Sequence, residues 1–137
     1  MKLFLSYKAN PNAFGKFKNT VFSEYAQKKI KMDILELFFE HKADPNIKSK
    51  SGSSAFHKLC NNRNVNKQFL ELFISKKAEI NLLDISHNTP LHLLCKNNFV
   101  DHGMLKLMLE NKSDPNLFNL ERNTLNFFFL FFFVFYF

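Results

Sequence analysis

The chain has 137 residues, 46% of them apolar, which is enough for one modest domain with a single core. Lysine and arginine outnumber aspartate and glutamate by 19 to 12, so the net charge is +7. Two cysteines are too few for a disulfide scaffold, and the abundant phenylalanine excludes a disordered chain expanded by charge repulsion. Phenylalanine is unevenly distributed, because 8 of its 19 copies lie in residues 127–137.

The positive charge consists of lysines scattered along the whole chain, with only two arginines, Arg63 and Arg122. A nucleic-acid interface usually clusters arginine on one face, because the planar guanidinium binds phosphates and bases bidentately. We therefore interpret the lysines as solvated surface residues and expect no nucleic acid among the partners. The apolar stretch at the N-terminus is too short for a secretory signal, and two cysteines favour a reducing, cytoplasmic location.

Three sequence ladders with a spacing of 34 or 35 residues run through the chain. The first consists of loops that open with lysine and close with asparagine. The second consists of segments that open with threonine or serine, and the third of leucine followed by another apolar residue. Because the three ladders share one period, the chain is built from internal repeats. The ladders comprise residues 8–12, 42–46, 77–81 and 112–116; residues 20–23, 54–57, 89–92 and 124–127; and Leu3, Leu37, Leu72 and Leu107.

Each repeat predicts two helices followed by an extended loop. In the clearest unit, Thr89 is a good N-cap, and Pro90 takes the first helical position, where its missing N–H is not needed. Apolar residues at helical spacing then predict a first helix of about two turns, which ends at residues 97–98. A second helix is expected over about residues 101–111, and the loop at residues 113–116 ends it.

The segment Thr89-Pro90-Leu91-His92 matches the first four positions of the ankyrin signature Thr-Pro-Leu-His-x-Ala, so the chain resembles the ankyrin repeat family. This resemblance implies an all-α fold: an ankyrin-type α-solenoid of helix-turn-helix repeats with short hairpin loops. One departure is systematic. The family usually places a left-handed glycine after the second helix, whereas this chain has lysine at positions 8, 42, 77 and 112.

The repeat register divides the chain into six segments. Neither end resembles a polar capping unit, so we expect a fragment of a larger multidomain ankyrin protein or an imperfect gene model. The segments are a partial repeat with only a second helix (1–14), three full repeats (15–48, 49–83 and 84–118), the start of a truncated repeat (119–126) and a Phe-rich tail (127–137).

The tail is too short to span a membrane as a helix, because its residues would reach about 16 Å against a hydrocarbon core of about 30 Å. Three interpretations stay open for residues 127–137: read-through of thymine-rich non-coding sequence, a membrane tether, or a segment that packs over the last repeat. Under the second interpretation the protein is a membrane-associated ankyrin-repeat protein. Membrane contact is expected only through this tail.

Two His-x-x-Cys pairs, His57 with Cys60 and His92 with Cys95, have the residue types of a zinc site. The repeat pattern explains these two pairs better than a zinc site does. The resemblance implies that each histidine ties the start of its helix to neighbouring loops by hydrogen bonds. Both cysteines align with Ala26 as small packed residues, and neighbouring repeats should place them about 10 Å apart, too far for a disulfide.

Signals for catalysis are missing from the sequence. We find no glycine-rich phosphate loop, no close pair of carboxylates, and no nucleophile with a base and an orienting group. We therefore predict that the protein is not an enzyme and that it needs neither a metal nor another cofactor.

The remaining function is protein binding, which the resemblance places on the concave strip of hairpin tips and first helices. Phe17 and Ile85 are the best anchors, because they are apolar where the fold does not require it. The strip is mildly basic, so we expect a monomer that binds another protein through an acidic segment. The candidate partner-binding residues are Lys16, Phe17, Asn19, Gln27, Lys28, Lys50, Ser51, Ser53, Asn61, Asn62, Ile85, Ser86, Asn88, Lys96 and Asn97, with Leu120, Glu121 and Asn123 at the truncated tip.

Overall fold

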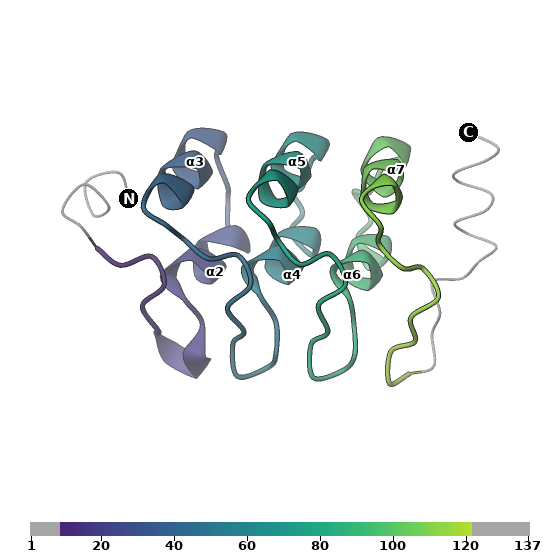
Figure 1. Cartoon of the computed structure of the whole chain (residues 1–137), viewed down its shortest axis with the longest axis horizontal. Coiled ribbons are helices and arrows are strands. Elements are labelled where there is room, and N and C mark those ends of the chain that lie inside the picture. Colours follow the sequence, from purple (N-terminus) through teal and green to yellow (C-terminus); the bar gives the residue numbers. More distant parts are fainter. Residues whose placement is uncertain (1–8, 122–137) are drawn as a thin grey trace.

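The computed structural model describes residues 9–121 as pairs of helices stacked in one row (Figure 1). Helices α2, α4 and α6 form one layer, α3, α5 and α7 form the second, and hairpin loops project beyond the first layer. Within residues 9–121 no strand is formed, only an isolated bridge between Phe14 and Thr20. In chain order the elements are η1 (Lys16–Lys18), α2 (Val21–Ala26), α3 (Met32–Glu40), α4 (Ala55–Cys60), α5 (Lys67–Ser75), α6 (Pro90–Lys96) and α7 (His102–Glu110).

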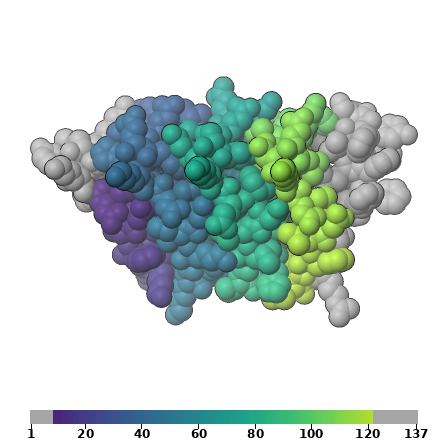
Figure 2. Space-filling model, in the orientation of Figure 1, coloured from purple at the N-terminus to yellow at the C-terminus, as the bar shows by residue number. Residues whose placement is uncertain are grey.

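This architecture confirms the predicted all-α solenoid. Each of the three full repeats in the sequence register holds one helix pair, and the space-filling view shows the repeats in direct contact from purple to green (Figure 2). Predictions for residues 1–8, for the chain beyond Glu121 and for the Phe-rich tail lie outside the described residues. Between residues 9 and 121, no helix is both long and apolar enough to cross a bilayer.

The first helix of each repeat begins at a hydroxyl N-cap, as the sequence predicts. Thr20, Ser54 and Thr89 accept hydrogen bonds from the backbone N–H three residues later, at 3.0, 3.5 and 3.3 Å. Pro90 occupies the first position of α6. These side chains satisfy amides that the helix itself leaves without acceptors, so the helix starts are set locally.

The core lies between the two helix layers and is rich in phenylalanine. Phe22, Phe56 and Phe73 are fully buried, and the Phe73 ring stacks on both of the others, with centroids 5.4 and 5.8 Å apart. Phe22 belongs to the first full repeat, whereas Phe56 and Phe73 belong to the second. Leu91 and Met108 fill the equivalent buried positions of the third repeat. Because the core crosses repeat boundaries, each repeat depends on its neighbour for stability.

A polar bridge also joins consecutive loops. The Asn46 Nδ2 donates to the Lys77 carbonyl at 3.0 Å, and its Oδ1 accepts from the Glu79 N–H at 2.8 Å. Asn12 and Asn81 make the same pair of bonds, to residues 42 and 44 and to residues 112 and 114 respectively. A side-chain amide suits this position because it carries a donor and an acceptor together.

Lysine takes the left-handed conformation after each described second helix, with φ of 61° at Lys42, 62° at Lys77 and 67° at Lys112. Lysine therefore adopts the conformation for which the family usually has glycine. The conformation costs a non-glycine residue about 1 kcal/mol, and a cation at a helix C-terminus recovers about 0.3–1 kcal/mol. The same lysines present the carbonyls that the asparagine bridges bind.

Replacement of Asn46 by alanine tests the bridge. Asn46→Ala leaves the Lys77 carbonyl and the Glu79 N–H without their partner. We expect the free energy of unfolding, measured by urea denaturation, to fall by about 1–2 kcal/mol. Asn98→Ala makes the same chemical change at an exposed loop residue and should stay within about 0.5 kcal/mol of the wild type. Equal effects of the two substitutions would contradict the structural role of the bridge.

Candidate functional site

The hairpin tips of consecutive repeats are joined by backbone hydrogen bonds. The Lys50 N–H donates to the Phe17 carbonyl at 2.9 Å, and the Ile85 N–H donates to the Ser51 carbonyl at 3.1 Å. A third bond, from the N–H of Leu120 to the carbonyl of residue 86, is 3.0 Å long. The tips therefore form one continuous edge, visible as the row of loops below α2, α4 and α6 (Figure 1). Because main-chain groups hold the tips together, the tip side chains stay available to a partner.

Each of the first three tips turns through a residue of positive φ: Lys18 at 55°, Gly52 at 74° and His87 at 58°. At Gly52 the approach of the next tip also requires glycine. A Cβ atom there would lie 2.7 Å from the Ile85 backbone nitrogen, closer than Cβ atoms approach other atoms in proteins. The missing side chain thus lets the second and third tips pack against each other.

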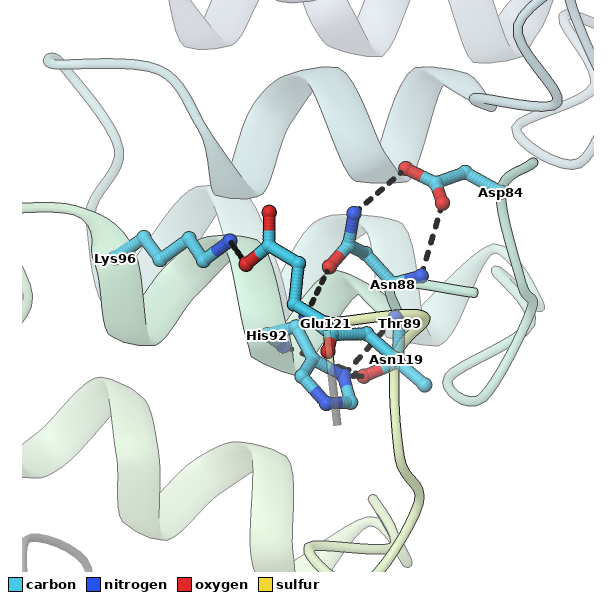
Figure 3. Close-up of polar contacts among 7 residues, drawn as sticks. All are labelled: Asp84, Asn88, Thr89, His92, Lys96, Asn119 and Glu121. Carbon is cyan, nitrogen blue, oxygen red and sulfur yellow. Dashed lines mark hydrogen bonds and ion pairs between the residues drawn. The ribbon is translucent and has the colours of Figure 1, made fainter. Parts of the chain in front are cut away.

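The third tip is braced by the Asp84 carboxylate (Figure 3). Its Oδ1 accepts from the N–H groups of Ser86 at 2.8 Å and Asn88 at 2.9 Å, and its Oδ2 accepts from the Asn88 Nδ2 at 3.3 Å. The Asn88 Oδ1 accepts from the Nδ2 of Asn119 in the following loop, at 2.9 Å. Asn88 is a predicted partner-binding residue, but its side chain is hydrogen-bonded at both ends to other residues of the protein.

The two signature histidines sit at the starts of α4 and α6. The Ser54 N–H donates to the His57 Nδ1 at 3.3 Å, so the proton of the neutral ring is on Nε2, which donates to the Asn88 carbonyl at 3.1 Å. This confirms at His57 the expected tie between a helix start and the next hairpin. The Nδ1 of His92 makes the equivalent contact with the Thr89 N–H, at 3.1 Å (Figure 3).

Burial lowers the pKa of His57 below its ordinary value of 6.5, although the Asn88 carbonyl opposes the shift. The neutral ring satisfies both of its nitrogens, whereas a protonated Nδ1 would meet the Ser54 N–H donor. The fold therefore selects the neutral form.

This preference makes stability depend on pH. Below pH 6.5 the unfolded chain binds a proton at His57 that the folded chain resists, so stability is retained above pH 6.5 and lost as the pH falls through the folded pKa. Urea denaturation at about pH 7.5 and about pH 5.5 should show a lower free energy of unfolding at the acidic value. His57→Gln should be less stable at the higher pH and should lose less on acidification. An unchanged acid loss in that variant would contradict the assignment.

Cys60 and Cys95 are free thiols, the first buried and the second half-buried. Burial raises both pKa values, that of Cys95 to about 12, so neither thiol readily forms the thiolate that binds zinc or attacks a substrate. Cys60 and Ala26 have no exposed surface, in line with the small packed residues expected at this position. In the part of the chain that the structure describes, no three potential metal ligands come together.

Two of the predicted partner-binding residues, Asn62 and Asn97, are buried. The Nδ2 of Asn62 donates to the carbonyls of Ala26 and Lys28 at 2.8 and 2.7 Å, and that of Asn97 donates to the carbonyls of Cys60 and Asn62 at 3.1 and 2.8 Å. The prediction that they face the binding groove is wrong. They supply donors to the carbonyls at the end of the preceding repeat's first helix, which the helix leaves without partners.

The first three tips surround an open hollow of about 470 Å³. The two predicted anchors lie on it together, with Phe17 62% exposed and Ile85 66% exposed. Sequence reasoning missed Lys58 of α4, which also lines the hollow. The helical period carried a signal for it, because Lys58 lies about one turn before the predicted residue Asn61. The complete lining is Phe17, Asn19, Ser49, Lys50, Ser51, Lys58 and Ile85.

A second hollow, of about 760 Å³, shares Phe17, Ser49 and Lys50 with the first. Its other lining residues are Gly15 and three lysines. The Lys16 Nζ lies 5.1 Å from the centre of the Phe17 ring. Among residues 9–121, none of the lysines around this hollow pairs with a carboxylate. The four lysines of the lining are Lys16, Lys18, Lys48 and Lys50.

The other predicted positions lie along the first helices and the tips. Lys96 forms an exposed ion pair with Glu121 at 3.5 Å (Figure 3). The Gln27 Nε2 donates to a Glu24 carboxylate oxygen at 3.0 Å. Ser53 is half-buried, and its carbonyl accepts from the Ser49 N–H at 3.0 Å. Exposed side chains remain at Lys28, Asn61 and Ser86.

Stacked helix pairs with projecting hairpins define an α-solenoid. Residues 22–119 match the family model described as Ankyrin repeats (3 copies), so the chain belongs to the ankyrin repeat family. No curated protein matches the chain in sequence. Ankyrin repeats generally serve as protein–protein interaction modules and are typically non-enzymatic.

Proposed function

We propose that the protein is a non-enzymatic module that binds another protein along its hairpin tips and first helices. One observation carries the proposal: Phe17 and Ile85 are largely exposed on a shared hollow, although neither belongs to the core. Covering apolar surface is favourable by about 25 cal/mol per Å². An exposed apolar pair beside a hollow is therefore a place where a partner gains affinity by covering it.

The construction of the tips supports this role. Backbone hydrogen bonds between tips, the Gly52 contact and the Asp84 brace hold the surface in place before any partner arrives. A surface that is already ordered loses little conformational entropy on binding, so more of the contact energy appears as affinity. The excess of lysine around the hollows favours an acidic partner segment.

Position-specific photo-crosslinking tests the proposal. A photoreactive amino acid is placed at Ser51 or Ser86 on the tips, or at Gln68 or Lys106 on the exposed side of α5 and α7, in the full chain. In an extract of the source cells, we expect discrete adducts from the two tip positions and none of the same mass from the outer helices. Circular dichroism checks that all four variants are folded. Adducts from the outer helices alone would contradict the proposed surface.

A further inference from the structure

We infer that the two adjoining hollows together bind one short motif, a bulky apolar side chain next to a cluster of carboxylates. The inference rests on the proposed function and specifies the chemistry of the partner. The occupant is an acidic segment of another protein, and the two halves of its motif contact different but continuous parts of the surface.

The first hollow supplies the apolar half of the site. Phe17 and Ile85 expose most of their side chains there, and small polar groups from Ser49 and Ser51 lie between the first and third tips. The volume of about 470 Å³ is open to solvent and is large enough for a leucine, methionine or phenylalanine side chain. Such a side chain is stabilised between Phe17 and Ile85, because its apolar surface is removed from water there.

The second hollow supplies the charged half. Four lysines line it, and its lining contains no acidic residue. The Lys48 Nζ donates to the Leu83 carbonyl at 2.8 Å, which fixes the charge in place without neutralising it. Several cations around one concave surface add their potentials and attract a carboxylate cluster.

Two carboxylates, those of Glu24 and Asp84, lie beside residues of the first hollow and keep their negative charge, but among the residues described neither forms an ion pair with a lysine of the two linings. Glu24 accepts from the Nδ2 of Asn19 at 2.6 Å and from the Nε2 of Gln27 at 3.0 Å. Asp84 uses both of its oxygens inside the third tip. Lys50 and Lys58 make no ion pair within the described range 9–121 and can receive a partner's carboxylates.

The two halves form one site because Phe17, Ser49 and Lys50 line both hollows. A partner side chain seated between Phe17 and Ile85 therefore has the lysine-lined hollow immediately beside it. The lining has no arginine and offers a single aromatic ring, so it lacks the forked donors and stacking platforms of a nucleic-acid site. These features favour a peptide.

Selection from a phage-displayed library of random linear peptides tests the inference with the full chain. We expect the enriched peptides to combine an excess of aspartate and glutamate with a neighbouring leucine, methionine or phenylalanine. A synthetic peptide from this pool should bind more weakly as salt increases. Replacing its apolar residue by alanine should lower its affinity about tenfold.

Substitutions in the protein test whether the peptide binds at the two hollows. Lys50→Glu should lower the affinity for the selected peptide about tenfold, because it replaces an attraction by a repulsion. Lys106→Glu makes the same change on the outer face of α7 and should leave the affinity unchanged. Ile85→Ser should weaken binding and leave the thermal midpoint unchanged, because Ile85 is exposed.

The inference is overturned if no peptides are enriched, if the enriched peptides lack acidic residues, or if Lys50→Glu and Lys106→Glu weaken binding equally. Tighter binding of a DNA or RNA oligonucleotide than of the selected peptide would also overturn it. Crosslinks at Ser51 and Ser86 without an acidic motif would leave the proposed function standing. If neither the crosslinks nor the acidic motif is found, the proposed function and the inference are both contradicted.

Discussion

In three successive loops the closing asparagine binds a carbonyl and an N–H of the next loop, and this bridge fixes how consecutive repeats stack. Asn12, Asn46 and Asn81 make the bridge at three successive boundaries. Both of its partners belong to a loop whose lysine has a left-handed backbone. The aromatic core crosses the boundary between the first two full repeats, with Phe73 stacked on Phe22. A polar contact that sets register and an apolar contact that supplies energy therefore act between the same repeats.

The binding surface follows from this stacking. Because loops are held in register, the tips come close enough for the main-chain bonds between Phe17 and Lys50 and between Ser51 and Ile85. Gly52 permits the approach of the second and third tips, since a Cβ there would meet the third tip. The hollows between the tips then arise from the backbone, and their apolar character comes from Phe17 and Ile85, exposed side chains that do not belong to the core. Such side chains can differ without loss of stability, which is how one scaffold serves different partners.

Most of the fold could be predicted from the sequence, because its signals are local and repeated. Thr89 and Pro90 mark a helix start by their own chemistry, and the 34- to 35-residue period transfers that assignment to the other repeats. The site was predictable only in part. Phe17 and Ile85 stand out as apolar residues at tips, but the burial of Asn62 and Asn97 depends on carbonyls 34 to 37 residues earlier in the chain. The helical period places Lys58 on the same face as Asn61, but the hollow that Lys58 lines forms only when three tips are assembled.

Hydrogen exchange of individual amides, followed by NMR, tests the bridge most directly. The N–H groups of Asp44, Glu79 and Asp114 donate to the bridging asparagines although they lie in loops. If the bridges hold the stack together, these amides exchange at least about a hundredfold more slowly than an unprotected chain. The amide of Asn98, in the exposed loop after α6, provides the fast reference. Exchange of the three bridge amides at the rate of Asn98 would contradict the account.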